Sequence, residues 1–456
     1  MLDQIVDAVE HRTPEGIAAA ISRLIRSGSL HAGDRLPTVR DVASTLGVSP
    51  ATVSNAWQAL SGVGLIMSRG RAGSYVLQAA APWMPPHFGE LAGSHVVARL
   101  DLSTGTPDPE LLPDLTAALM KVPTRADTAS YLSAPVLPQL DLHLRASWPY
   151  PVQALTIVDG ALDAISRSLE TLVRFGDRVV VENPGFPPFF DLLDHFGVER
   201  IPVDVDGEGM RPDQLARALQ LSPAAIILQP RAHNPTGVSM TSERMRELAR
   251  VLRANTHIGD PVVIEDDHSG EISSSPAHSI GTWLPHRTLH VRSYAKSHGP
   301  DLRIAALGGP EPLIDRIVAR RMIGPGWTSR MLQTILYELL TASVSLDAVH
   351  DARRIYQARQ TLLSEALVAA GVAHAPSDGI NTWVPVLDEK AAIVTLAASG
   401  IRAAAGSSFI AAPSPSVPSP SSGAFPTPQF LRVTAGRVTE DFTLVAGLLA
   451  AAARAT

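Results

Sequence analysis

Five near-continuous apolar runs between residues 178 and 308 constrain the fold of this chain more than any other feature. Each run has the length of a strand, and amphipathic helical stretches lie between the runs. A strand that is apolar on both faces has to be covered on both faces, which is typical of parallel sheets in α/β proteins. The pattern therefore predicts a large, parallel-rich sheet domain. The runs are Arg178–Glu182, Ala224–Leu228, Pro261–Glu265, Thr288–Arg292 and Ile304–Gly308.

Length and proline content predict how the chain is divided. With 456 residues, the chain is too long for one ordinary core. A Pro-rich stretch predicts a linker over residues 79–98. We therefore expect an N-terminal domain over residues 1–78 and an α/β domain over residues 99–456. A smaller C-terminal α+β part is expected over about residues 340–456.

The N-terminal residues have the pattern of a helix-turn-helix followed by a wing. Thr38 precedes one short helix, the turn Gly47-Val48-Ser49 follows it, and Pro50 opens a second helix that reaches Leu60. Residues 64–77 predict two short strands around a basic, glycine-rich tip. We therefore predict a mainly α-helical winged helix-turn-helix. Its use for protein contacts instead of DNA binding is the alternative.

The second helix of this block is expected to lie in the major groove of double-stranded DNA. Basic side chains on the first helix and on the wing are expected to contact phosphates or the minor groove. The net charge of −6 requires such a contact to be local. The predicted DNA-binding residues are Arg40, Ser49, Ala51, Thr52, Ser54, Asn55, Arg69 and Arg71.

Composition excludes several classes of protein. Without cysteine, the chain has no disulfide, no zinc finger and no thiolate nucleophile. It lacks a long uncharged apolar stretch and a basic signal sequence, so we expect a cytoplasmic protein. Only three of its 38 basic residues are lysine, namely Lys121, Lys296 and Lys390. A lysine kept where arginine prevails indicates an amine that must be able to lose its proton.

Lys296 belongs to an ordered set of four polar residues. Asn234, in Asn234-Pro235-Thr236-Gly237, and Asp266 and Lys296 each follow a predicted strand, and Arg303 lies seven residues further on. Ligands of open α/β sheets bind at the carboxyl ends of strands. An amine can form a Schiff base, a carboxylate can pair with a pyridinium nitrogen, an amide can donate to a phenolate, and a guanidinium can bind phosphate. The set predicts a pyridoxal-phosphate (PLP) site.

Two parts of the sequence resemble known families. The string Gly33-Asp34-Arg35-Leu36-Pro37-Thr38-Val39-Arg40-Asp41-Val42, with its surroundings over residues 15–77, resembles the GntR family of bacterial regulators. Residues from about 100 to 456 resemble fold-type I aminotransferases. The combination resembles the MocR-type subfamily of GntR regulators. Pro50 stands where the GntR family usually has Arg, so we give Pro50 no role beyond starting the helix.

The resemblance implies a role for each candidate ligand residue. Lys296 would form the Schiff base, Asp266 would pair with the pyridine nitrogen, and Asn234 would donate to the phenolate oxygen. The phosphate would be bound by Arg303, Ser293 and the backbone of Gly160 and Ala161. The remaining implied roles are ring stacking for Phe186, a contact with the phenolate oxygen for His268, a contact with the neighbouring subunit's phosphate for Tyr131, and binding of an α-carboxylate for Arg432.

Two positions depart from the aminotransferase pattern. His268 stands where most relatives have Tyr; it can donate the same hydrogen bond, but its charge varies near neutral pH. Asp159 stands where relatives usually have Ser, and a carboxylate beside a phosphate is unfavourable unless it points away. His268 together with residues 231–237 resembles a MocR-type subgroup linked to vitamin B6 metabolism.

The function expected from these features is a PLP-responsive transcription factor. A homodimer would sense PLP, or PLP joined to an amino acid or amine, and would reposition two DNA-binding heads to control vitamin B6 or amino-acid metabolism. An active aminotransferase with an accessory DNA-binding domain is the enzyme alternative, and a PLP-binding scaffold with constitutive DNA binding is a third. The helix-turn-helix favours the regulator, because a metabolic aminotransferase has no use for one.

Overall fold

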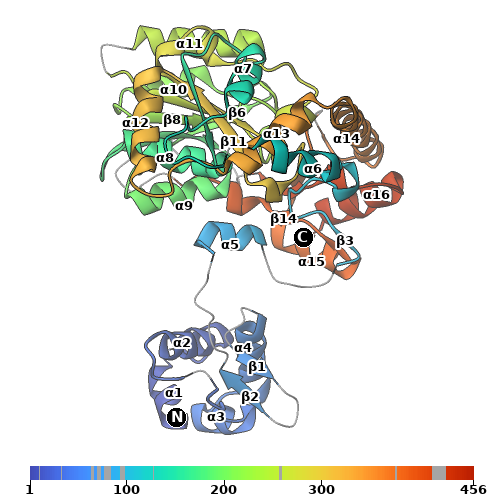
Figure 1. Ribbon diagram of the computed structural model, residues 1–456. Coiled ribbons are helices and arrows are strands. Elements are labelled where there is room, and N and C mark those ends of the chain that lie inside the picture. Colours follow the sequence, from blue (N-terminus) through green and yellow to red (C-terminus); the bar gives the residue numbers. More distant parts are fainter. Residues whose placement is uncertain are drawn as a thin grey trace. The chain divides into compact units, whose positions relative to one another are not determined.

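The structure is a computed structural model whose chain contacts form two compact units, Met1–Pro85 and Pro86–Thr456 (Figure 1). None of its described helices is long and apolar enough to cross a membrane. The described residues are 1–9, 11–31, 33–62, 66–68, 73–76, 84–92, 98–126, 128–255, 259–374, 377–412 and 428–455.

The first unit is a winged helix-turn-helix, as predicted. Four helices precede a short antiparallel hairpin in which Met67 pairs with Tyr75. Apolar side chains from all of these elements, such as Ile17, Leu46 and Trp57, form one buried core. The elements are α1 (Leu2–Ala8), α2 (Pro14–Arg26), α3 (Val39–Leu46), α4 (Pro50–Gly62), β1 (Ile66–Ser68) and β2 (Ser74–Val76).

Local capping explains the sharp turn between α3 and α4. Thr38 and Asp41 form a reciprocal capping box at the start of α3, which satisfies backbone N–H groups that have no partner within the helix. Gly47 ends α3 in the left-handed conformation, with φ +67°, which glycine adopts at little cost. The chain therefore turns between α3 and α4, where the sequence predicted a turn.

The second unit is built on a mixed eight-stranded sheet with the order β4-β11-β10-β9-β8-β5-β6-β7. The fold-type I prediction is confirmed. Alternate residues of one strand enter different cores: Val179 and Val181 pack under α8, α9 and α12, whereas Val180 packs under α10 and α11. The strands are β4 (Ala154–Val158), β5 (Arg178–Asn183), β6 (Glu199–Asp206), β7 (Gly209–Met210), β8 (Ala225–Leu228), β9 (Val262–Asp267), β10 (Thr288–Ser293) and β11 (Ala305–Gly309).

Helices cover both faces of this sheet (Figure 1). A further core beside β4 and β11 is formed with α7 and α13, where Leu140 and Leu336 are fully buried. This double covering is the reason for the continuous apolar runs in the sequence. The helices are α6 (Thr116–Arg125), α7 (Pro138–Ala146), α8 (Ala161–Leu172), α9 (Pro187–Phe196), α10 (Pro212–Leu219), α11 (Ser242–Ala254), α12 (Glu311–Met322) and α13 (Arg330–Thr341).

Strand β11 runs antiparallel to both of its neighbours. The sequence pattern had grouped this run with the parallel strands, which was wrong because burial on both faces does not depend on strand direction. The reversal brings the start of β11 to the sheet edge where β10 and β4 end. Ala305 pairs there with Ser293 and with Val158.

The C-terminal elements form a smaller α+β layer with its own core. Its sheet has the order β12-β15-β14, and Leu102, from the start of the unit, is buried in the same core. Leu100 and Asp101 (β3) also pair in parallel with Ile401 and Arg402 (β13). The other elements are α14 (Ser343–Ala369), β12 (Thr382–Val386), α15 (Glu389–Ala398), β14 (Ala404–Ala405), β15 (Gln429–Val433) and α16 (Phe442–Ala453).

A short helix lies within the segment that the sequence predicted to be a linker. Helix α5 (Pro86–Ala92) packs against α9. Asp191 of α9 accepts hydrogen bonds from the backbone N–H groups of His87 and Phe88, at 3.1 and 2.9 Å. Within the predicted linker over residues 79–98, residues 86–92 are therefore helical and bound by a carboxylate about a hundred residues away.

Candidate ligand site and DNA-binding surface

The candidate ligand residues meet at the edge of the sheet where the parallel strands end. Asp266 is the next-to-last residue of β9, and Lys296 follows β10 by three residues. Asn234 lies in the loop after β8. Arg303 joins them because β11 runs in the reverse direction, so that the residues before β11 lie at this same edge.

Gln229 holds two of these residues in place, and the sequence reasoning missed it. Its Nε2 donates to Asp266 Oδ2 at 2.8 Å, and its Oε1 accepts from the backbone N–H of Asn234, also at 2.8 Å. Its own N–H donates to Glu182 at 2.8 Å. The available signal was a polar side chain directly after the apolar strand β8.

Asp266 is buried and only partly satisfied. Its Oδ2 is bound by Gln229, but its Oδ1 is buried without a hydrogen-bond partner among the described residues. Burial, with the charges of Asp267 and Glu182, raises the pKa of Asp266 to about 7, against the opposing effects of Gln229 and Lys296. This carboxylate therefore suits a ligand that brings a hydrogen-bond donor or a positive charge.

Lys296 has an amine that can be neutral near physiological pH. Burial and the Arg432 guanidinium lower its pKa to about 8, while Asp266 opposes them. Its Nζ donates to the carbonyl of Gly105. An amine with such a pKa is partly deprotonated at neutral pH and can act as a nucleophile toward an aldehyde.

Arg432, on strand β15, lies close enough to Lys296 to affect its pKa. It is fully buried, donates to the carbonyl of Ser103, and lies 3.4 Å from Asn234 Oδ1. Burial lowers its pKa to about 10. Gly105, at φ +61°, allows this close approach, because a Cβ there would lie 2.5 Å from Arg432 Nη1. The structure thus brings Lys296, Asp266, Asn234 and Arg432 together.

Gly160, Ala161 and Arg303 form a second group, at the start of α8. Gly160 precedes the helix at φ +105°, and no side chain caps the helix there. Arg303 is exposed and donates to the carbonyl of Asp159 at 3.2 Å. A Cβ on Gly160 would lie 3.2 Å from the Arg303 guanidinium. Uncapped N–H groups beside a guanidinium can bind an anion such as phosphate.

The Asp159 carboxylate is bound by two residues that sequence reasoning missed. It accepts hydrogen bonds from Thr328 at 2.6 Å and from Arg321 at 3.2 Å. Arg321 is 2% exposed. These contacts compensate the negative charge that was expected to disfavour a phosphate. Arg321 is the next-to-last residue of α12, next to Arg320, and nothing in the sequence distinguishes it.

The His268 ring forms a hydrogen bond with the backbone of the chain. Its Nε2 lies 2.9 Å from the carbonyl oxygen of Ala232, so that nitrogen carries the proton and donates it. Burial, and next the charge of Lys296, lower the pKa of His268 to about 4, which keeps the ring neutral. The predicted contact with a phenolate oxygen would require this hydrogen bond to be exchanged.

The three remaining predicted ligand residues stand outside the two groups. Phe186 precedes α9 and packs edge-on against Phe189, at 5.2 Å between ring centroids. Ser293 ends β10 and accepts from the backbone of Ala295 at 3.3 Å. Tyr131 is 87% exposed, and its ring meets Trp327.

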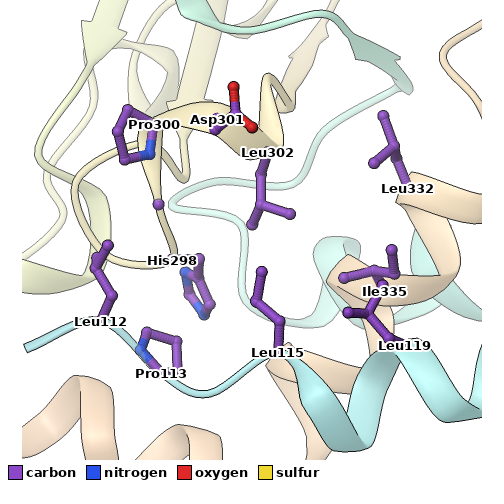
Figure 2. A pocket seen from close by; sticks show the side chains of 11 residues that line it. Leu112, Pro113, Leu115, Leu119, His298, Pro300, Asp301, Leu302, Leu332 and Ile335 are labelled. Carbon is purple, nitrogen blue, oxygen red and sulfur yellow. The ribbon is translucent and has the colours of Figure 1, made fainter. Parts of the chain in front are cut away.

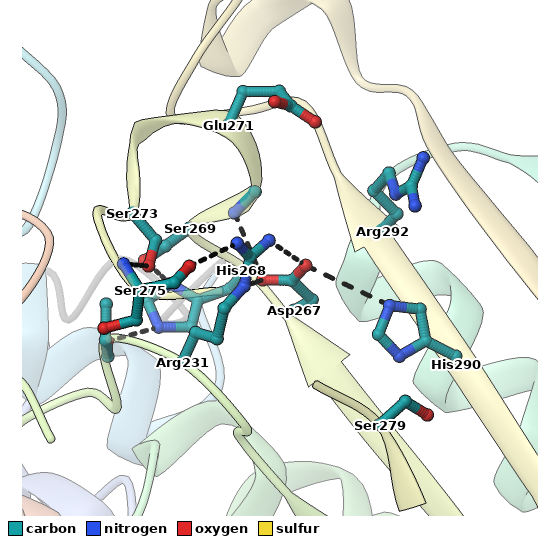
Figure 3. Close-up of polar contacts among 12 residues, drawn as sticks. Arg231, Asp267, His268, Ser269, Glu271, Ser273, Ser275, Ser279, His290 and Arg292 are labelled. Atoms are coloured by element: carbon teal, nitrogen blue, oxygen red, sulfur yellow. Dashed lines mark hydrogen bonds and ion pairs between the residues drawn. The ribbon is translucent and has the colours of Figure 1, made fainter. Parts of the chain in front are cut away.

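The opposite face of β9 carries a network of buried charges (Figure 3). Asp267 accepts two hydrogen bonds from Arg231, one of them at 3.2 Å, and lies 4.0 Å from His290 Nε2. His290 Nδ1 donates to Glu265 at 2.8 Å, and Glu265 also accepts from Ser279. This network therefore holds β9 on the face opposite to Asp266.

An apolar cavity of about 360 Å³ adjoins the loop between Lys296 and Arg303 (Figure 2). Its walls come from that loop, α6 and α13, and leucine predominates in them. His298 and Asp301 are its only ionisable lining residues. It contains none of the predicted ligand residues. The lining residues are Leu112, Pro113, Leu115, Leu119, His298, Gly299, Pro300, Asp301, Leu302, Leu332 and Ile335.

In the first unit, the predicted DNA-binding residues lie on the outer side of α3 and α4. Arg40, Ala51 and Asn55 are exposed, and Thr52 and Ser54 are half-buried. The exposed Ser49 accepts from the N–H of Thr52 at 3.1 Å, so its hydroxyl also caps the start of α4. Arg69 and Arg71 lie outside the described residues.

The chemistry of the donor set fits PLP. A ring N–H could be accepted by the unpartnered Asp266 Oδ1, and an aldehyde could be held by Lys296. A phosphate could be bound at the uncapped start of α8 beside Arg303.

Comparisons with known proteins agree with both halves of the chain. The family model for bacterial regulatory proteins of the gntR family matches residues 13–76, and that for aminotransferase class I and II matches residues 98–444. The vitamin B6 salvage pathway transcriptional repressor PtsJ of Salmonella typhimurium is 36% identical, over 89% of this chain and 93% of the relative. The pyridoxine biosynthesis regulator PdxR of Corynebacterium glutamicum is 26% identical, over 78% of each chain.

Two solved aminotransferase structures have the same fold as the second unit. An archaeal alanine:glyoxylate aminotransferase matches with a TM-score of 0.68 and 20% identity, covering 80% of this chain and 92% of its own. The LysN α-aminoadipate aminotransferase of Thermus thermophilus matches with a TM-score of 0.66 and 19% identity, covering 77% and 91%. At these identities the likeness shows the fold alone. The chain belongs to the MocR-type subfamily of GntR helix-turn-helix regulators, in which an aminotransferase class I and II domain follows the DNA-binding domain.

Proposed function

We propose that this protein is a PLP-responsive transcriptional regulator. PLP, bound at Lys296, changes the affinity of the winged helix-turn-helix for its operator. Sustained transamination is negligible. The site acts by binding its ligand differently in two conformations of the protein.

The observation that carries the proposal is that Asp266 and Lys296, two buried groups that affect each other's pKa, both have perturbed pKa values at one sheet edge. A buried carboxylate with a pKa near 7 and an unpartnered oxygen is costly for a protein to keep. A buried amine with a lowered pKa beside it is equally costly. Perturbed groups of opposite type at one sheet edge are typical of a ligand site. The same set of groups suits PLP at both ends of its ring.

When bound, PLP supplies an aldehyde that condenses with amines and a pyridine ring that withdraws electrons. The residues of the chain hold and orient it. Asp266 accepts the ring N–H, and Gln229 fixes the orientation of that carboxylate. Asn234 contacts the ring oxygen, and Arg303 with Gly160 and Ala161 binds the phosphate. Arg432 offers a carboxylate site for an amino acid that joins PLP.

The functional unit in the proposal is a homodimer. Tyr131 and its neighbour Leu132 are 87% and 96% exposed, which is unusual for large apolar side chains. Met120 and Leu142, on α6 and α7, are 75% and 72% exposed. A second copy that covers this surface would give Tyr131 the role implied by the resemblance, a contact with the partner's phosphate.

The metabolic role proposed is control of vitamin B6 genes. The support is the B6 salvage repressor named above, which is 36% identical over most of both chains. A regulator of such genes needs only modest coupling: a tenfold change in operator affinity corresponds to about 1.4 kcal/mol. Catalysis requires far more, because the site must stabilise a transition state by many kcal/mol.

The test is a paired experiment on the full-length protein. PLP is titrated into an operator-binding assay, and keto-acid formation is then measured across a panel of amino acids. The proposal predicts a PLP-dependent change in operator affinity and no sustained turnover. Turnover at ordinary enzyme rates without a PLP effect on DNA binding would instead favour the aminotransferase.

DNA binding by the first unit is tested with Arg40→Ala and Thr52→Ala. Arg40→Ala should weaken binding to every sequence and make the salt dependence shallower, because it removes a phosphate contact. Thr52→Ala should mainly relax sequence preference. Operator affinity that survives deletion of residues 1–78 would rule out this role for the unit.

A further inference from the structure

One carboxylate of α9, that of Asp191, accepts three hydrogen bonds from the first residues of helix α5. Asp191 Oδ1 accepts from the backbone N–H and from Nδ1 of His87, at 3.1 and 2.8 Å, and its Oδ2 accepts from the N–H of Phe88 at 2.9 Å. The Asp191 side chain is 9% exposed. The His87 ring also packs edge-on against Phe190, with 5.8 Å between centroids. These contacts make Asp191 the principal polar anchor of α5.

Helix α9, which carries Asp191, connects this anchor to one of the predicted ligand residues. Phe186, the residue expected to stack on the ligand ring, immediately precedes α9. Asp191 lies five positions further along the chain, a helical rise of about 7.5 Å. Phe189 and Phe190 are buried in the sheet core, so the first turns of α9 are tightly packed as one rigid element. A ligand that displaces Phe186 would therefore shift Asp191 as well.

A second contact route leads from the ligand site to α5. The turn before Phe186 is fixed by Gly185 N–H, which donates to the carbonyl of Phe409 at 2.8 Å. Arg432 lies over the Phe409 ring, at 5.2 Å from its centroid. The short helix that ends at Phe409 (Gly406–Phe409) also contacts α5. Both expected ligand contacts, Phe186 and Arg432, thus touch the elements that support α5.

The place of α5 in the chain gives this anchor a consequence. The compact first unit ends at Pro85, and α5 starts at Pro86. α5 is therefore the first element of the ligand-binding unit that follows the DNA-binding unit along the chain. We propose that Asp191 is a positioning residue that couples ligand binding to operator affinity, through its hold on His87 and Phe88. This inference rests on the proposed PLP response.

The test compares full-length wild type with Asp191→Asn, which keeps the size of the side chain and removes its charge and one acceptor. Asp194→Asn is the matched control, since Asp194 lies on the same helix, is 50% exposed, and pairs with Arg200 rather than with α5. PLP binding is followed by visible absorbance, and operator affinity is measured with and without PLP.

Asp191→Asn should bind PLP like wild type, but the PLP-induced change in operator affinity should fall from about tenfold to less than about threefold. Asp194→Asn should keep the full change. A merely structural role for Asp191 would lower PLP binding or the operator affinity of the PLP-free protein. If Asp191→Asn does not fold, His87→Ala removes the side-chain bond to Asp191 and the ring contact with Phe190 but leaves both backbone bonds in place, so it should reduce the PLP-induced change in the same direction and by less.

An unchanged PLP response in the Asp191 or His87 variant would overturn the inference. A wild type that binds PLP without any change in operator affinity would instead overturn the proposed function, so the two failures are distinguishable.

Discussion

Two consecutive carboxylates on β9 have the same burial and opposite surroundings. Asp266 faces the candidate ligand site, where Gln229 is its only hydrogen-bond donor among the described residues and burial raises its pKa to about 7. Asp267 faces the other side, where two hydrogen bonds and the charge of Arg231 outweigh burial and lower its pKa (Figure 3). On the face that carries Asp267, here called the structural face, the chain itself supplies the counter-charge. On the face that carries Asp266, here called the ligand face, it does not.

The difference separates structural charges from charges kept for a ligand. A buried carboxylate paired with a guanidinium is a closed unit, and removing either member leaves an uncompensated charge. A buried carboxylate with an unpartnered oxygen is destabilising until a donor arrives. The comparison predicts that substitutions on the two faces will have opposite effects on stability and on ligand binding.

The largest effect is expected at Lys296, on the ligand face. Lys296→Ala should remove all PLP that borohydride fixes to the chain, because neither of the other lysines belongs to the site. Mass spectrometry of the reduced protein measures this. Lys390→Ala, which changes an exposed lysine, is the control and should label fully. Label found on Lys121 or Lys390 would show that the ligand face is wrongly assigned.

Asp267→Asn should be the most destabilising change on the structural face. It leaves Arg231, which is 8% exposed, without its partner, at a cost of about 3–5 kcal/mol. Denaturant unfolding of the PLP-free protein gives the value. A loss below about 1 kcal/mol would mean that the two faces do not differ in the way described.

Asp266→Asn should stabilise the PLP-free protein while weakening PLP binding. The pKa of Asp266 is raised from 3.8 to about 7, so the folded state holds a proton that the unfolded state releases between these values. Stability contributed by this group therefore falls as pH rises from about 4 to about 7, by at most about 4 kcal/mol. The stability gained by the variant should grow over that range and level off above it. A gain that is independent of pH would contradict the raised pKa.

The smallest effect is expected at the far end of the structural network. Ser279→Ala removes one donor from Glu265, which keeps its bonds from His290 and from the backbone of Ile280. A loss of about 1 kcal/mol in unfolding free energy is expected, with PLP affinity unchanged. A large change in PLP affinity would indicate that the two faces of β9 are coupled.

The contrast between the faces also shows how far the sequence could be interpreted. Asp266 and Lys296 could be predicted because each follows an apolar run that ends at one sheet edge. The direction of β11 could not, because burial on both faces gives the same pattern in either direction. Arg303 lies at this edge because it precedes the reversed strand β11, and the sequence did not show that reversal.

The residues that the sequence did not reveal act through distant partners. Gln229 binds Asp266, 37 residues further along, and Arg321 binds Asp159, 162 residues earlier. Neither has a local pattern that marks it. The α5 helix, with only seven residues, has too little local signal and depends on Asp191. Contacts between residues far apart in sequence are set by packing, which periodicity and motifs do not encode.

The measurement that tests the central claim most directly is operator affinity with and without PLP, in wild type and in Lys296→Ala. PLP occupancy of the wild type is confirmed in the same samples by visible absorbance. We predict about a tenfold change in affinity for wild type and none for the variant, with both proteins binding the operator equally when PLP is absent. Wild type saturated with PLP and showing the same operator affinity as the PLP-free protein would contradict the claim.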